Sequence, residues 1–192
     1  MSVAMTRAAG QRSTGVELAR SLAAILIVLG AAAATLAALD RMPAWITGRA
    51  HGVVRVSSVT EAGRRLRARI ILPAYFPESL AWPPEEILVA SGAPPGVAVE
   101  ISPRGGGRPR LVVAQTGAPG RVPEILVPGT PLDGGSPIRI GDATGRVRRV
   151  IGTDGEVWWE LAWTYRSRSV VMRSRGDLEQ LLEMARSARE TP

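Results

Sequence analysis

The chain has 192 residues, with 24 basic and 17 acidic side chains and a formal net charge of +7. It has no cysteine and one histidine, which excludes disulfides and thiolate metal sites and leaves little for a catalytic triad. Every basic residue is arginine, so a P-loop lysine and a Schiff-base lysine are also excluded. We therefore expect a protein that is not an enzyme and that uses no metal and no cofactor.

The segment 21–39 is apolar and uncharged, and Arg20 and Asp40 flank it. At ~1.5 Å per residue such a helix extends over roughly 28 Å, close to the ~30 Å hydrocarbon core of a bilayer. Arginines outnumber acids in residues 1–20, so the positive-inside rule predicts a cytoplasmic tail and a translocated remainder. We interpret 21–39 as a transmembrane signal anchor. A signal peptide cleaved near residues 35–37 is the alternative, and the length of the apolar run favours the anchor.

The rest of the chain is interpreted as a juxtamembrane linker, 40–56, and one extracytoplasmic domain, 57–190. Ser58 and Glu61 have the spacing of a capping box, which predicts a short helix beginning there. An apolar stripe over residues 178–185, with acids before it and arginines after it, predicts a C-terminal helix.

Between these helices lie short apolar runs separated by turns rich in Gly, Pro and Asp, which is typical of antiparallel strands. The spacings are too short for the crossovers of a parallel sheet. The predicted fold class is α+β: a curved antiparallel sheet with a short N-terminal helix and a packed C-terminal helix. The predicted strands are 69–72, 86–90, 97–101, 109–116, 125–127, 138–140, 147–151, 157–165 and 169–172.

An aromatic, proline-rich loop contains Tyr75, Phe76 and Trp82. These rings are candidates for the mouth of an apolar ligand groove, or they close the edge of the core. In the strand 157–165, alternation places Trp158 on the face opposite the core-facing tryptophans. Trp158 is therefore a candidate partner contact, unless a second layer buries it.

The arginines cluster, and a basic surface would suit anionic lipid headgroups, a cell-wall polymer or an acidic partner. A solvated arginine face is the plainer alternative. Nucleic acid is not expected as a partner of a domain outside the cytoplasm. The candidate basic-surface residues are Arg64, Arg65, Arg148, Arg149, Arg173 and Arg175.

Two stretches carry a family resemblance. Residues 58–62 (SVTEA) and 72–78 (LPAYFPE), followed later by Leu161-Ala162-Trp163 and a helix over 178–187, resemble a family of uncharacterised bacterial extracytoplasmic domains. Members of this family commonly stand behind a single N-terminal transmembrane helix, and some are linked to anti-sigma factors. The resemblance implies a fold like that of the lipoprotein-carrier and periplasmic sigma-regulator group. Ser79 departs from the family, which has glycine after the glutamate, and no catalytic residue is implied.

Two functions remain open on the sequence. The first is a membrane-anchored binding or sensing module that engages a protein or a lipid-like ligand at the cell surface. The second is a non-catalytic accessory subunit held in a larger membrane complex by its transmembrane helix. An apolar cavity beside the 75–82 loop would favour the first.

Overall fold

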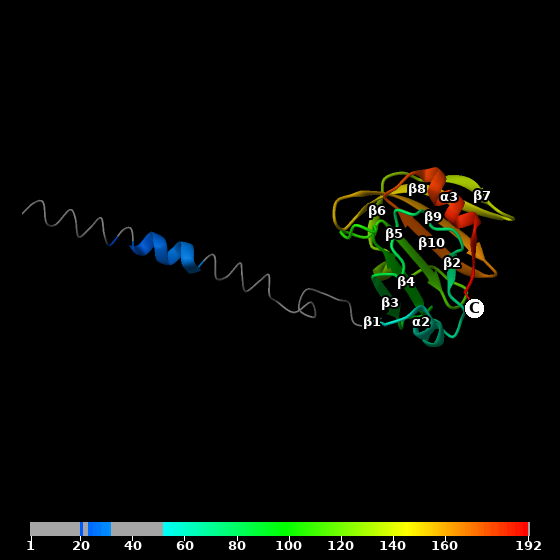
Figure 1. The fold of residues 1–192 in the computed structure, drawn as a ribbon, viewed down its shortest axis with the longest axis horizontal. Helices are drawn as coiled ribbons and strands as arrows, with labels where there is room; N and C mark the ends of the chain where they lie inside the picture. The colour runs from blue at the N-terminus through cyan, green and yellow to red at the C-terminus, as the bar shows by residue number, and fades with distance from the viewer. Residues whose placement is uncertain (1–19, 21–22, 32–51, 192) are drawn as a thin grey trace, which may run out of the picture. The chain divides into compact units, whose positions relative to one another are not determined.

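The computed structural model describes residue 20, residues 23–31 and residues 52–191, which fall into two units divided near residue 50 (Figure 1). In the first unit, residues 23–31 form a helix whose apolar side chains are exposed. Within the described residues, no helix has the length and apolarity needed to cross a bilayer. Most of the predicted tail and linker lies outside the described residues, as do positions 21–22 and 32–39 of the predicted signal anchor.

The second unit is built on a nine-stranded antiparallel sheet with the path β1-β3-β4-β5-β10-β9-β8-β6, and β7 also pairs with β8. Successive side chains of each strand point to opposite faces. The central strands β4 and β5 are buried on both faces over most of their length. In chain order, the bounds are β1 Val53–Arg55, β3 Glu86–Ala90, β4 Gly96–Ile101, β5 Leu111–Thr116, β6 Gly129–Pro131, β7 Ser136–Ile140, β8 Ala143–Gly152, β9 Val157–Tyr165 and β10 Arg168–Ser174.

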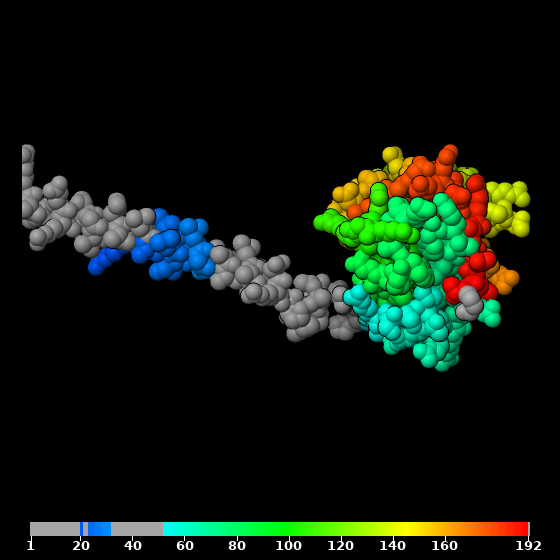
Figure 2. Space-filling view, in the orientation of Figure 1, coloured from blue at the N-terminus to red at the C-terminus, as the bar shows by residue number. Residues whose placement is uncertain are grey.

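The first face of this sheet carries the main core. Two helices, α2 (Val59–Leu66) and α3 (Leu178–Arg186), pack on it together with a small sheet of β2 (Ile71–Pro73) and β11 (Ala188–Glu190). In Figure 2 the C-terminal elements, coloured red, lie beside the teal β2 segment on the side shown. The predicted α+β class, with a short N-terminal helix and a packed C-terminal helix, is confirmed.

Helix α2 begins where the capping box predicts. The Ser58 hydroxyl accepts a hydrogen bond from the Glu61 backbone N–H, and the Glu61 carboxylate accepts one from the Ser57 backbone N–H. These bonds satisfy donors that the first helical turn leaves free. Ala62 and Leu66 of this helix are buried against the sheet.

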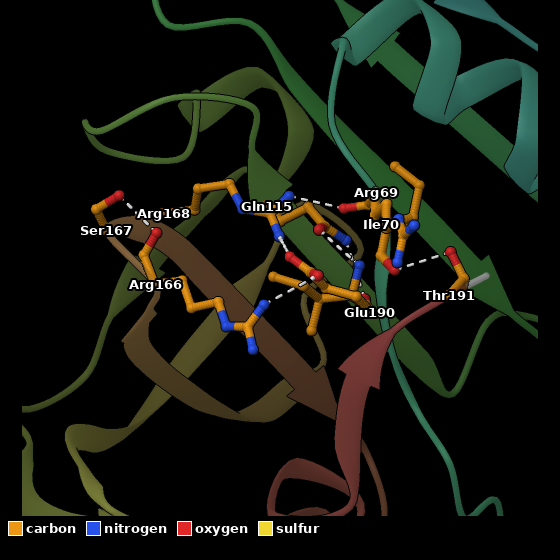
Figure 3. Close-up of polar contacts among 9 residues, drawn as sticks. Arg69, Ile70, Gln115, Arg166, Ser167, Arg168, Glu190 and Thr191 are labelled. Atoms are coloured by element: carbon orange, nitrogen blue, oxygen red, sulfur yellow. Dashed lines mark hydrogen bonds and ion pairs between the residues drawn. The ribbon is translucent and has the colours of Figure 1, made fainter.

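A polar clamp joins the two ends of the domain (Figure 3). The buried Gln115 side chain accepts a hydrogen bond from the Ile71 N–H and donates one to the Ile71 carbonyl, which fixes β2 above β5. Arg168 donates to the Arg69 carbonyl and pairs with Glu190 at 2.7 Å in each case. These contacts therefore hold residues 69–71, near the start of the domain, against β5, β10 and the C-terminal strand β11.

The second face is covered in part by residues 121–128, here called the crossing segment. Its middle is a 3-10 helix, η1 (Glu124–Leu126), and its Leu126 and Val127 pack on alanines of β3, β4 and β5. The strand predicted over 125–127 is therefore wrong. A Cβ at Gly96 would lie 2.8 Å from both Leu126 and Pro123, so only glycine allows this approach.

Candidate functional site

A cavity of about 200 Å³ opens on the second face, at the edge where three loops meet. Strands β4, β5, β9 and β10 supply its floor, while the crossing segment and the β8–β9 turn supply its walls. Most of the lining is apolar. The lining residues are Glu100, Pro109, Val112, Leu126, Val127, Pro128, Gly152, Thr153, Asp154, Trp158, Arg173 and Arg175.

The floor belongs to one row of side chains that runs across the sheet. The pairing register places these residues opposite one another on neighbouring strands, in the order Glu86, Glu100, Val112, Arg173, Glu160 and Arg148. Directly opposed residues on one face are close enough to interact. The row therefore has acids at its β3–β4 end and an arginine–glutamate cluster at its β9–β8 end, with Val112 between them.

The cluster centres on Glu160, which is 2% exposed. Arg173, also buried, donates from Nε and Nη2 to one carboxylate oxygen at 2.7 and 2.5 Å. Arg148 holds the other oxygen at 2.5 Å. Arg173 also donates to the Pro128 carbonyl at 2.8 Å, so the buried cluster fixes the end of the crossing segment that forms the cavity wall.

The wall opposite Glu100 is a stacked aromatic and ion-paired group. The Arg175 guanidinium lies 4.4 Å from the centre of the Trp158 ring, and it pairs with Asp154 in the β8–β9 turn. Partial desolvation acts to raise the pKa of Asp154, but hydrogen bonds from the Glu156 backbone and Trp158, together with Arg175, lower it overall. Asp154 therefore stays ionised and holds Arg175 over the ring.

Glu100 is the exception among the charged lining groups. Burial raises the pKa of its carboxyl above the usual value, and the carboxylates of Glu86 and Glu85 raise it further, against an opposing effect of Arg55. Within residues 52–191 the Glu100 side chain makes no hydrogen bond or ion pair at contact distance. The cavity thus presents one half-buried acidic group without a partner beside an apolar wall.

This arrangement suits binding. Arg173 and Arg175 are both already paired with carboxylates. The lining contains no histidine and no serine, and within it no nucleophile lies at hydrogen-bond distance from a base. Among the described residues, no group of three or more His, Cys, Asp or Glu side chains is placed to hold a metal ion.

The structure brings together some of the residues singled out from sequence and separates others. Trp158, Arg173 and Arg175 all line the cavity. Trp158 is 7% exposed, because the second face does have a partial covering layer there. The sequence predicts Arg173 on a basic surface, and this prediction is wrong: Arg173 is buried, pairs with Glu160 and donates to the Pro128 carbonyl.

The aromatic loop lies elsewhere in the domain. Phe76 is half-buried against the main core, and its ring centre lies 5.5 Å from that of Trp82, with the two rings tilted by 37°. Trp82 is 55% exposed. Tyr75 is exposed as well. None of these residues lines the cavity described here.

The remaining candidate arginines are dispersed. Arg64 and Arg65 are exposed on α2, where Arg65 pairs with Glu61 at 2.8 Å. Arg149 is exposed and lies 3.6 Å from Asp133, while Arg148 is partly exposed beside Glu160. Of the basic-surface candidates, only Arg173 and Arg175 line the cavity.

Sequence reasoning missed the acidic and apolar parts of the site. The sequence indicates Glu100 and Val112 only as strand positions, and it predicts Leu126 and Val127 as part of a strand. One signal was available: alternation places a charged residue, Glu100, one position from the end of an otherwise apolar strand. Comparison with known proteins gave no match among family models, curated proteins or solved structures.

Proposed function

We propose that this chain is a membrane-anchored, extracytoplasmic binding module, and that the cavity on the second sheet face holds a group of its protein or lipid-like ligand. One observation carries the proposal: the cavity combines an apolar wall with a half-buried carboxylate, Glu100, that has no partner within the domain. Mostly apolar pockets with a few convergent polar groups are typical binding sites.

The rigidity of the walls supports the same proposal. The buried pairing of Arg173 with Glu160 fixes Pro128, and Asp154 fixes Arg175 over Trp158. A site built on strands and supported by a second set of hydrogen bonds loses little conformational entropy when a ligand enters it.

The membrane part of the proposal is supported by the sequence alone. The apolar segment 21–39 and the net positive charge of residues 1–20 favour a single-pass anchor with the N-terminus in the cytoplasm. The resemblance of residues 58–62 and 72–78 to domains found behind such anchors supports the same location.

Site-specific photo-crosslinking of the full-length protein in native membranes tests the proposal. A photoreactive residue replaces Pro128, which is exposed and lines the cavity, and in a control it replaces Pro131, which is exposed on β6. We expect an adduct with a protein or a lipid from position 128 only. Absence of adducts from position 128, or the same adducts from both positions, would overturn it.

A further inference from the structure

We infer that the ligand of this cavity is a polypeptide segment in which one large apolar side chain stands next to an arginine or a lysine. The inference rests on the proposed function and specifies its partner. The apolar side chain occupies the space between Val112, Leu126 and Trp158, and the cationic group meets the Glu100 carboxylate.

The size of the cavity favours a side chain over an acyl chain. At about 200 Å³ it is smaller than the ~300–1,000 Å³ of pockets that enclose a whole small-molecule ligand. Pockets that receive a single anchoring side chain are typical of the centre of protein interfaces. A lipid tail would need a longer channel between the sheet and its cover, and the crossing segment packs directly on the alanines there.

The charges favour a cation over an anion. Both arginines of the lining already pair with an acid inside the domain: Arg175 pairs with Asp154, and Arg173 pairs with Glu160, which it shares with Arg148. The Arg175 Nε is the one buried side-chain donor of the described residues that has no hydrogen-bond partner. On the opposite side, Glu100 is unpaired, Glu86 is opposite it on β3, and the Glu86 carboxylate lies 3.6 Å from the Arg55 guanidinium. An arriving guanidinium or ammonium group would remove the repulsion between these carboxylates.

The strand register places the acidic and the apolar subsite side by side. Glu100 is opposite Val112 on the neighbouring strand, so the acidic and apolar subsites are adjacent side-chain positions on one face. Such neighbours lie ~4.5–5.5 Å apart at their Cβ atoms. Neighbouring residues of a bound peptide can therefore reach both subsites.

The test selects binders from a random peptide display library on full-length protein in nanodiscs. We expect enriched peptides to share a large apolar residue next to Arg or Lys. Their affinity should fall about tenfold for Glu100→Gln, where charge is lost and shape is kept. Selection on Glu100→Arg should instead enrich peptides with Asp or Glu beside the apolar residue. Glu156→Gln, on the exposed β8–β9 turn outside the lining, is the matched control and should leave affinity unchanged.

The two proposals fail in distinguishable ways. If no peptide with that pattern is enriched, or if its binding is indifferent to Glu100→Gln, the polypeptide inference is overturned. A lipid adduct from position 128 in the same circumstances would keep the cavity as a binding site and replace the ligand class. If position 128 also gives no adduct, the proposed function falls as well.

Discussion

Loss of the Glu160 charge should destabilise the domain far more than loss of its partly exposed partner, Arg148. In Glu160→Gln the shape stays, but the Arg173 guanidinium, whose side chain is 8% exposed, remains buried without a counter-charge. Breaking a buried ion pair by removing one partner costs about 3–5 kcal/mol. We take the lower end, about 3 kcal/mol, because the Pro128 carbonyl and the glutamine oxygen still accept hydrogen bonds from Arg173.

The matched variants follow from exposure. Arg148 is 35% exposed, so Arg148→Gln should cost only about 1 kcal/mol, as solvent screens that half of the cluster. The double variant Glu160→Met with Arg173→Met removes both buried charges together. Its free energy of unfolding should lie within about 1–2 kcal/mol of the wild-type value, and the unpaired Pro128 carbonyl should account for most of the difference.

Urea unfolding of the full-length protein in mild detergent, followed by tryptophan fluorescence, measures these differences, since Trp158 and Trp159 immediately precede Glu160 in sequence. The expected order of stability is wild type, Arg148→Gln, the double variant, then Glu160→Gln. If Glu160→Gln cost less than about 1 kcal/mol, or if the double variant were no more stable than it, the cluster would not be an electrostatic unit.

Three further outcomes follow from single contacts. Gln115→Leu should lower the free energy of unfolding by about 2–4 kcal/mol in the same urea assay, because it leaves the Ile71 N–H and carbonyl buried and unpaired; a loss below about 1 kcal/mol would show that β2 is held otherwise. Gly96→Ala should cost about 1–3 kcal/mol by displacing the crossing segment, whereas Gly105→Ala, which meets nothing within 4 Å, should be neutral; equal effects would contradict the packing. Because the native pKa of Glu100 is raised, the wild type should lose stability relative to Glu100→Gln as pH rises from 4.5 through that pKa, with no such difference below 4.5; urea unfolding at about pH 3.5 and about pH 7 measures this, and an unchanged difference would refute it.

The local parts of the fold were predictable because they depend on neighbours in the sequence. The capping box at Ser58 fixes the start of α2, and the alternation in residues 157–165 fixes β9 from end to end. The sequence predicts a strand in the crossing segment because its apolar run is short. Three residues are too few to show whether apolar side chains repeat with the period of a strand or of a 3-10 helix. Pro123 just before it was the available warning.

The site was predictable only in fragments. Trp158 and Arg175 stood out by residue type, but Glu100 becomes a lining residue only through the pairing of β4 with β5 and of β5 with β10. The β5–β10 pair joins strands that are far apart in the chain, and no local pattern in a single sequence specifies such a pairing. The apolar surface supplied by Leu126 depends on the same long-range packing.

Nuclear magnetic resonance of the tryptophan indole N–H groups decides most directly whether the cavity or the aromatic loop receives the ligand. The full-length protein in nanodiscs, with labelled tryptophan, is titrated with a peptide selected as above. Trp158 lines the cavity, whereas Trp82 lies on the exposed aromatic loop and contacts Phe76. We predict that the Trp158 resonance shifts with saturation while the Trp82 resonance stays in place. A shift of Trp82 with Trp158 unchanged would assign binding to the aromatic loop and contradict the cavity as the site.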